Sequence, residues 1–512
     1  MNKKLKLLAL FLAASTLAAC GSNITPNPSQ QTTHTGTSRS AAREDIAIHL
    51  MSDISSFDPK NWFVGADFMV YQQMYDPLLR ILPDQSVELV LAESYEINED
   101  ATVYTFKIRD DVPFHNGDTL RASDVAFSYE YFADGPYYYS YLDGMDKVEA
   151  LDGNQVRFTL REPDATFMQA AEVVCIVSER AITEGGDRYD DNPVGTGAYR
   201  YADYERGVSI RLTRFDAYYK GPAPIRNVTF RIIPDVVTAT ISLQAGDLDC
   251  IFDNFYDTAA YHNIQNDPNL KFVPLRQNQF ISFALNHELP PFDNVLVRQA
   301  VCYAIDRELI IDTAVNGLAD VATNMVAPGI FGYSRNIEMG YIYDVGQAKA
   351  LIEQAGLKTP MSIGTIKALE TQKKEAEILR QNLAAIGLNA TVKVIEEATL
   401  MADLRAGDYS ICSMGYGMTT DADLYSLLLH SDNIGTTNYA RYANPRVDAL
   451  FALGKMTVDT KKRLEIYTEL FKISGEEVAH VPVHFPHVLA VMSADLQWEK
   501  ANSKCVYDMS WR

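Results

Sequence analysis

The spacing of apolar residues changes along this chain of 512 residues, and the change limits what the chain can fold into. In the first two-fifths, apolar side chains recur at every second position in four segments. These segments are residues 103–109, 156–160, 208–213 and 228–233. A period of two predicts strands with one buried face. The first part of the body is therefore expected to be mostly β-sheet.

From about residue 294 the spacing becomes that of an amphipathic helix, with Asp293 as a possible N-cap. Further on, a strand pattern at 361–366, a helix pattern at 373–386 and a strand pattern at 390–394 follow one another. A β-α-β order implies parallel strands in an α/β lobe. A chain of this length with 47% hydrophobic residues is too large for one core, so two or three lobes are expected, with a ligand cleft between them.

The N-terminus has the features of an export signal. Lys3, Lys4 and Lys6 precede a short apolar stretch at 7–14, and the sequence Leu-Ala-Ala-Cys ends at Cys20. The apolar stretch is too short to span a bilayer, which predicts a signal peptide at 1–19. Cleavage before a cysteine resembles a bacterial lipobox, so Cys20 is expected to be lipidated and residues 20–44 to form a flexible tether. The alternative is a soluble secreted protein with a chance cysteine.

Charge and cysteine content exclude some classes of protein. The formal net charge is −22, and no basic block is large enough for a nucleic-acid-binding surface. Beyond Cys20 the cysteines are odd in number and contain no C-x-x-C pair, which disfavours a zinc ribbon or a redox dithiol. One or two disulfides and buried free thiols both remain open for Cys175, Cys250, Cys302, Cys412 and Cys505.

No motif predicts an enzyme or a cofactor. Nucleophile-elbow, zinc-protease, P-loop and dinucleotide-binding patterns are all missing from the sequence. His480, His484 and His487 cluster, but the two prolines among them favour an extended segment, with His480 and His484 on one face, over a helical metal site. His115 lacks a nearby catalytic partner and is expected to be structural. Gly195 and Gly197 are interpreted as part of a chain crossing between lobes.

Ordered sequence blocks carry a resemblance to a known family. They are FDP at 57–59, YDPLL at 75–79, LAESYE at 91–96, YTFKIRD at 104–110, VPFHNGD at 112–118, ASDVAFS at 122–128, PVGTGAY at 193–199, AGDLD at 245–249, PFDNVLVRQA at 291–300, YAIDR at 303–307, LRAGDY at 404–409 and NPRVDAL at 444–450. With these blocks in this order, the chain resembles extracellular solute-binding protein family 5, the oligopeptide- and dipeptide-binding lipoproteins of bacterial ABC importers.

The resemblance implies an α/β class II periplasmic-binding-protein fold with two lobes, a hinge and an additional domain. Lobe one would comprise residues 45–79, 193–283 and 483–512. The extra β-rich domain would be 80–192, and lobe two would be 284–482. Ligand binding is expected to close the lobes about crossings near 193–199, 283 and 482.

The resemblance also implies where a ligand binds. In peptide-binding members an extended peptide lies between the lobes, against segments that match residues 62–65 and 415–421 here. The expected ligand-binding residues are Trp62, Phe63, Val64, Gly65, Tyr416, Gly417, Met418, Thr419 and Asp421.

One position departs from the family pattern. Peptide-binding members place an Asp for the ligand's ammonium group where this chain has Thr419, and the nearest acids are Asp421 and Asp423. Asp421 would either replace the missing acid or cap a helix formed by residues 424–429. The departure leaves open a non-peptide solute: a nickel chelate, haem, an opine or an oligosaccharide.

The expected partners follow from the same resemblance. They are a peptide or other small solute, the permease subunits of an ABC importer, its ATPase subunits indirectly, and the membrane through the lipid anchor. The protein is expected to be an extracytoplasmic monomer without enzymatic activity, cofactor, metal or nucleic acid.

Overall fold

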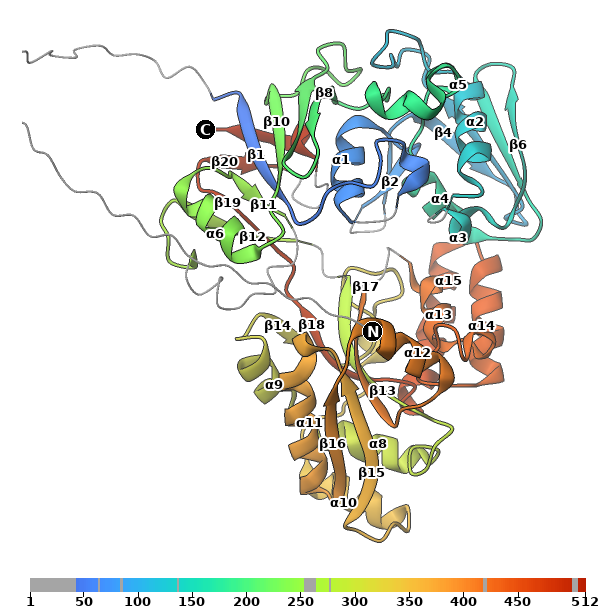
Figure 1. Cartoon of the computed structure of the whole chain (residues 1–512). Helices are drawn as coiled ribbons and strands as arrows, with labels where there is room; N and C mark the ends of the chain where they lie inside the picture. Colours follow the sequence, from blue (N-terminus) through green and yellow to red (C-terminus); the bar gives the residue numbers. More distant parts are fainter. Residues whose placement is uncertain are drawn as a thin grey trace, which may run out of the picture. The chain divides into compact units, whose positions relative to one another are not determined.

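The computed structural model describes residues 43–62, 65–82, 86–135, 138–252, 264–275, 278–417, 421–499 and 505–512. Residues from Ala42 to Arg512 form one compact unit, shown in Figure 1. Within the described ranges no helix combines the length and the apolar content that crossing a membrane requires.

A seven-stranded sheet draws on the beginning, middle and end of the chain, which are blue, green and red in Figure 1. Its order is β12-β19-β11-β1-β10-β9-β8. The strands are β1 (Asp45–Leu50), β8 (Tyr199–Glu205), β9 (Ser209–Arg214), β10 (Asn227–Ile232), β11 (Cys250–Ile251), β12 (Leu270–Pro274) and β19 (Leu489–Ser493). The helices α1 (Gly65–Met74) and α6 (Val236–Ala245) belong to the same stretches of chain.

A four-stranded antiparallel sheet lies within residues 92–160, in the order β4-β5-β7-β6. Its strands are β4 (Ala92–Ile97), β5 (Val103–Ile108), β6 (Met145–Leu151) and β7 (Gln155–Leu160). The buried faces of β5 and β7 alternate as the sequence predicts, with Tyr104, Phe106, Val156 and Phe158 in the core. The helices of this region are α2 (Ala122–Phe132), α3 (Tyr139–Leu142), α4 (Met168–Val173) and α5 (Glu179–Gly185).

The third large sheet has six strands in the order β14-β18-β13-β17-β15-β16. They are β13 (Gln279–Leu285), β14 (Ala319–Val321), β15 (Met361–Ala368), β16 (Leu388–Val394), β17 (Ile411–Gly417) and β18 (Val481–Pro486). β15 and β16 are parallel and α11 (Lys373–Ala385) connects them, which confirms the predicted β-α-β unit. One core, with Phe280 and Ala284, covers one face of β13, and a second, with Phe283 and Leu285, covers the other.

Helices complete this α/β region. They are α8 (Val295–Ala304), α9 (Arg307–Ala314), α10 (Val345–Gln354), α12 (Glu397–Ala406), α13 (Ser426–Leu429), α14 (Pro445–Met456) and α15 (Thr460–Glu476). The cap of α8 is Asn294, whose side chain accepts a hydrogen bond from the N–H of Leu296, so the predicted cap at Asp293 is wrong by one residue. Two short hairpins, β2 (Leu79–Ile81) with β3 (Val87–Leu89) and β20 (Leu496–Trp498) with β21 (Met509–Trp511), lie outside the large sheets.

The five cysteines beyond Cys20 all lie within the described ranges. Cys175, Cys250, Cys302, Cys412 and Cys505 are each buried, and none of them forms a disulfide. Of the two alternatives that the sequence leaves open, the structure contains buried thiols, which pack as small apolar side chains.

Candidate functional site

The first predicted ligand segment follows a turn that is held by side chains from distant parts of the chain. Asp58 caps the short 3-10 helix Pro59–Asn61 by accepting a hydrogen bond from the N–H of Lys60. The carboxylate of Asp190 accepts hydrogen bonds from the backbone N–H groups of Phe57 and Asp58, at 2.9 and 3.0 Å. These contacts fix the chain immediately before Trp62.

Trp62 lies against aromatic neighbours. It stacks on Phe68 of α1, with ring centroids 5.0 Å apart, and meets the edge of Tyr138. Gly65 begins α1, and an added Cβ there would meet no atom within 4 Å. Phe63 and Val64, which the sequence also predicts as ligand contacts, lie outside the described residues.

The second predicted segment is the end of β17. The ring of Tyr416 points into the core, where it stacks on Phe280 at 5.0 Å, whereas Gly415 and Gly417 on either side are exposed. Burial raises the pKa of the Tyr416 phenol well above its usual range. This segment can therefore offer its backbone to a ligand, and the tyrosine ring serves the core. Met418 and Thr419 lie outside the described residues.

The end of β17 has a strand on only one side within the described part of the chain. β13 pairs with β17 along its whole length, to Gly417, but β15 pairs only with Ile411 and Cys412. On the β15 side, the amide of Gln372, turned so that its nitrogen faces Ser413, donates to the Ser413 carbonyl at 3.0 Å and accepts from the N–H of Gly415 at 3.3 Å. Beyond Gly415, no strand of the described ranges pairs with that side of β17, which is therefore called its open edge.

Asp421 is buried and makes two kinds of contact. One oxygen accepts a hydrogen bond from the N–H of Asp423, so Asp421 caps the 3-10 helix Ala422–Tyr425, which continues into α13. Both oxygens also accept hydrogen bonds from Arg463 of α15, at 2.5 and 2.7 Å. The cap predicted from the sequence is present, and a guanidinium already compensates the charge of this carboxylate. A role as partner of a ligand ammonium stays a prediction.

Asp423, two residues further on, has no cation bound directly to it among the described contacts. Its carboxylate accepts a hydrogen bond from the hydroxyl of Tyr467 at 2.9 Å. Burial and the neighbouring charge of Asp421 raise the pKa of Asp423 to about 6, although Tyr467 and Arg463 act in the opposite direction. Asp423 is therefore the acid of this segment whose charge is least compensated.

His115 has the structural role that the sequence predicts. Its Nδ1 accepts a hydrogen bond from the N–H of Gly195 at 3.2 Å, so its Nε2 carries the proton and donates to the carbonyl of Gly197 at 2.9 Å. Burial lowers the pKa of His115 to about 4. The ring is neutral at pH 7 and joins the turn before α2 to residues 193–199.

The histidines near the C-terminus are separated by a β-bulge. The segment is extended as predicted, but the pairing of β13 with β18 shifts between Ile281 and Ser282, which inserts one residue and reverses the alternation. His480 therefore contacts Ser282 on one face, and His484 contacts Glu375 on the other. The prediction that these two histidines share a face is wrong. Within the described ranges, no three metal-binding side chains come together.

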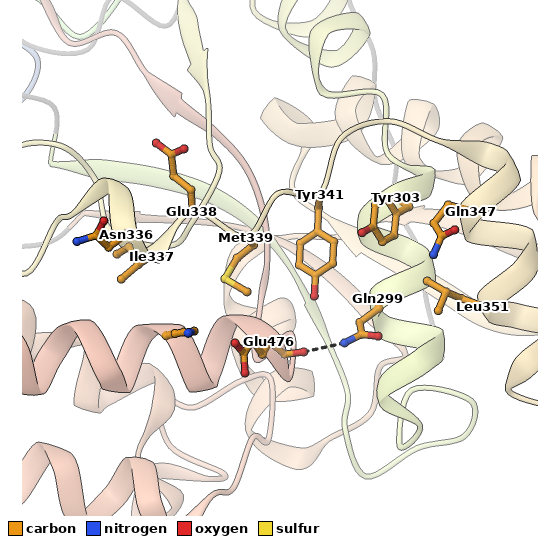
Figure 2. A pocket seen from close by; sticks show the side chains of 11 residues that line it. Gln299, Tyr303, Asn336, Ile337, Glu338, Met339, Tyr341, Gln347, Leu351 and Glu476 are labelled. Atoms are coloured by element: carbon orange, nitrogen blue, oxygen red, sulfur yellow. Dashed lines mark hydrogen bonds between the residues drawn. The ribbon is translucent and has the colours of Figure 1, made fainter.

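A pocket of about 330 Å³ lies within residues 299–476, apart from both predicted segments (Figure 2). Gln299 and Tyr303 of α8 line one side, and the edge of the Tyr341 ring meets the Tyr303 ring at 5.1 Å. Gln299 donates to the backbone carbonyl of Glu476, the bond drawn dashed in Figure 2. No predicted ligand residue lines this pocket.

Sequence reasoning missed Arg463, although its position carried a signal. The buried face of α15 is formed by Arg463, Tyr467, Leu470, Phe471 and Ser474, at the spacing of an amphipathic helix. An arginine on an apolar helix face requires a buried acceptor, because an unpaired buried charge is costly. The acceptor, Asp421, lies 42 residues away in sequence, and nothing local identifies it.

Comparison with known proteins identifies the family. Residues 86–436 match the model of the bacterial extracellular solute-binding proteins, family 5. The heme-binding protein A of Haemophilus influenzae is 30% identical over 514 residues, which cover 93% of this chain and 93% of that protein. The dipeptide-binding protein of Escherichia coli is 27% identical over 438 residues, which cover 77% of this chain and 81% of that protein.

Solved structures show the same fold. HbpA2 from Haemophilus parasuis superposes with a TM-score of 0.83 and 26% identity, covering 91% of this chain and all of that one. The predicted α/β fold class, that of periplasmic binding proteins enlarged by an additional domain, is thereby confirmed. The chain belongs to the bacterial extracellular solute-binding proteins of family 5, and it is an extracytoplasmic binding component of an ABC importer and not an enzyme.

Proposed function

We propose that this protein captures peptides between its two lobes and delivers them to the membrane permease. Lobe one comprises residues 45–79, 193–283 and 483–512, the extra domain 80–192, and lobe two 284–482. The observation that carries the proposal is the open edge of β17 beyond Gly415.

An open strand edge suits a peptide better than it suits a compact solute. A peptide can join a sheet edge as an additional strand, because its N–H and C=O groups repeat at the spacing of the strand it joins. Gly417 is exposed, and a Cβ built there would have Cγ of Gln279 as its nearest neighbour, at 3.9 Å. The space beside this residue is therefore open, and because glycine has no side chain an extended main chain can approach closely. The Escherichia coli relative is named for dipeptides, which supports the same ligand class.

The ligand segments are Trp62, Phe63, Val64 and Gly65 on one side, and Tyr416, Gly417, Met418, Thr419 and Asp421 on the other. The first contains Trp62, whose ring packs on Phe68, and the second would contribute mainly backbone groups. A ligand ammonium group at Asp421 would have to share that carboxylate with Arg463. Asp423 is the better electrostatic partner, because Tyr467 is the only side chain that hydrogen-bonds it among the described contacts.

Calorimetric titration with short peptides tests this proposal. We expect free-amine tripeptides to bind, and Asp423→Asn to weaken them by about 2–5 kcal/mol while affecting the N-acetylated forms much less. Asp421→Asn is the matched comparison and should weaken both forms to a similar degree. Selective loss of the free-amine peptide in Asp421→Asn would instead assign the ammonium to Asp421. Failure of every short peptide to bind would contradict the function.

Haem is the second candidate, because the relative with 30% identity is named for heme. A haem-binding protein would take up the porphyrin with a Soret absorbance change, and the tripeptides would give no heat of binding. The remaining alternatives, a nickel chelate, an opine or an oligosaccharide, have no observation in this chain that favours them.

The lipid anchor belongs to the same proposal. After removal of residues 1–19, acyl chains on Cys20 would attach the protein to the outer face of the cell membrane, with residues 20–44 as a tether. In this arrangement the protein works as a monomer beside the permease.

A further inference from the structure

A continuous set of contacts leads from the end of the second ligand segment to the extra domain. It begins at Asp421, whose two carboxylate oxygens face two nitrogens of Arg463. The side chains of this pair are 12% and 8% exposed. Two parallel hydrogen bonds between planar groups fix their relative orientation, so a displacement of Asp421 must displace or break its bond with Arg463.

Arg463 also contacts α14. Its Nε donates to the backbone carbonyl of Gly454 at 3.0 Å, and its Nη2 also contacts the Tyr467 hydroxyl. A Cβ at Gly454 would lie 2.7 Å from the Tyr467 ring, so α14 and α15 touch closely at this point. The guanidinium therefore ties Asp421 to the residue immediately before Lys455.

Lys455 reaches across to the extra domain. Its Nζ lies 3.3 Å from Oδ2 of Asp164. The other oxygen of Asp164 accepts hydrogen bonds from the backbone N–H and the hydroxyl of Thr166. Asp164 is thereby the N-cap of the 3-10 helix Ala165–Phe167. Tyr104 holds the Asp164 carbonyl at 2.6 Å. These hydrogen bonds hold Asp164 in place independently of Lys455.

The ion pair between Lys455 and Asp164 is named the latch, and its position differs from that of the other ion pairs. Among ion pairs of the described residues, it alone joins residues 80–192 to residues 284–482. It lies in an acidic surrounding: Asp423 and Asp143 also act on Lys455, and together with Asp164 they outweigh the effect of burial and raise its pKa. Removing the lysine charge would remove the cation on which all three carboxylates act.

We propose that Asp421, Arg463, Gly454 and Lys455 form a relay that couples the position of the second ligand segment to the latch. The inference rests on the proposed function, in which residues 416–421 line the ligand cleft. A ligand that holds Asp421 in its present position favours the latch, and by reciprocity a formed latch favours ligand binding. Asp421 is then a positioning residue that acts through Arg463.

The latch is tested without any ligand. In the purified full chain, Lys455→Gln should increase hydrogen exchange at the amides of Ala165–Phe167 about 3- to 5-fold, as expected for a partly exposed ion pair. It should also increase the radius of gyration in small-angle scattering at low salt. Asp164→Asn, which keeps the cap, should have the same effect, and the double variant should add little. Lys461→Gln, an exposed lysine of α15, is the control.

Hydrogen exchange at high salt and in the variant Asp421→Asn completes the test. In 500 mM NaCl the wild-type protein should exchange at the rate of Lys455→Gln, since screening weakens the pair. Asp421→Asn should raise exchange at Ala165–Phe167 although it does not touch that helix. Unchanged exchange and radius in Lys455→Gln would overturn the latch, and an effect of Lys455→Gln without one of Asp421→Asn would overturn the relay. Because no peptide is used, failure of the peptide proposal would leave these results unaffected.

Discussion

Close backbone contacts explain why glycine occupies positions 195 and 197, which the sequence motif alone would assign to hinge motion. A Cβ at Gly195 would lie 2.0 Å from the carbonyl oxygen of Met74, and one at Gly197 would lie 2.5 Å from that of Gln73. Neither glycine has a positive φ. Their sequence motif suggests glycines that permit hinge motion, but the contacts require glycine because the end of α1 approaches so closely.

The buried ring of His115 predicts how stability depends on pH. Its folded-state pKa of about 4 lies below the unfolded value of 6.5, so below pH 6.5 the unfolded chain binds a proton that the folded chain does not. This contribution is complete above pH 6.5 and is lost as the pH falls toward 4, by about 3 kcal/mol in total. In His115→Gln, urea unfolding at pH 7 and pH 4.5 should show a smaller difference than in wild type. An equal loss in both proteins would show that His115 is not buried as a neutral ring.

The surroundings of the candidate site residues could be predicted from sequence only in part. Trp62 and Tyr416 follow from matching sequence blocks, but nothing in those blocks tells that the Tyr416 ring stacks on Phe280 in the core. The partner of Asp421 is a residue 42 positions away, so the alternatives of cap and ammonium partner omitted the guanidinium that binds it. Long-range pairing is decided by packing, which local spacing does not report.

At the scale of elements, the open end of β17 is the feature on which the peptide proposal depends. β13 and β15 cover different lengths of β17, because β15 ends its pairing at Cys412 whereas β13 continues to Gly417. The uncovered backbone can accept a ligand strand.

A peptide bound at this edge should respond to N-methylation with a period of two. Alternate residues of a strand direct their N–H groups toward the same neighbour, so a methyl group on those nitrogens removes a hydrogen bond and methyl groups between them do not. We expect affinity to fall about 5-fold at alternate positions of a tetrapeptide, the effect of one hydrogen bond of about 1 kcal/mol. The unmethylated peptide is the reference in calorimetry. A uniform response along the peptide would contradict the strand arrangement.

The bounds of helices and strands were more predictable than the contacts of single residues wherever one face of the element is buried. The two-residue period placed β5 and β7, and the helical period placed α8 and α11, with ends displaced by one or two residues. Alternation failed at β18, because a bulge opposite Ile281 and Ser282 turns His480 and His484 to different faces. A bulge depends on the partner strand, which the sequence of β18 does not contain.

At the scale of the whole molecule, the proposed membrane anchoring depends on one cysteine. Residues 21–43 include almost no apolar side chains, so in the proposed arrangement the membrane affinity would come from acyl chains on Cys20, at about 0.8 kcal/mol per buried methylene. Cys20→Ala should therefore move the protein from the membrane fraction to the soluble fraction. Ser22→Ala is the matched control and should remain with membranes. Sedimentation of Cys20→Ala with membranes would contradict the lipid anchor.

The architecture as a whole followed from the order of its parts. A β-rich region before an α/β region, on a chain too long for one core, indicates separate sheets, and the described residues form three large ones. The family resemblance placed residues 483–512 in lobe one, but no sequence pattern showed that β19 would pair between β11 and β12. Such pairing joins strands more than two hundred residues apart, beyond any local pattern.

Native mass spectrometry tests the central claim, that the cargo is a peptide, most directly. The full chain is purified without denaturation, exposed to a mixture of short peptides and desalted. We predict a series of bound masses that differ by amino-acid residues, released together on unfolding. A single haem, metal-chelate or sugar mass, or a protein that retains no peptide from the mixture, would contradict the account.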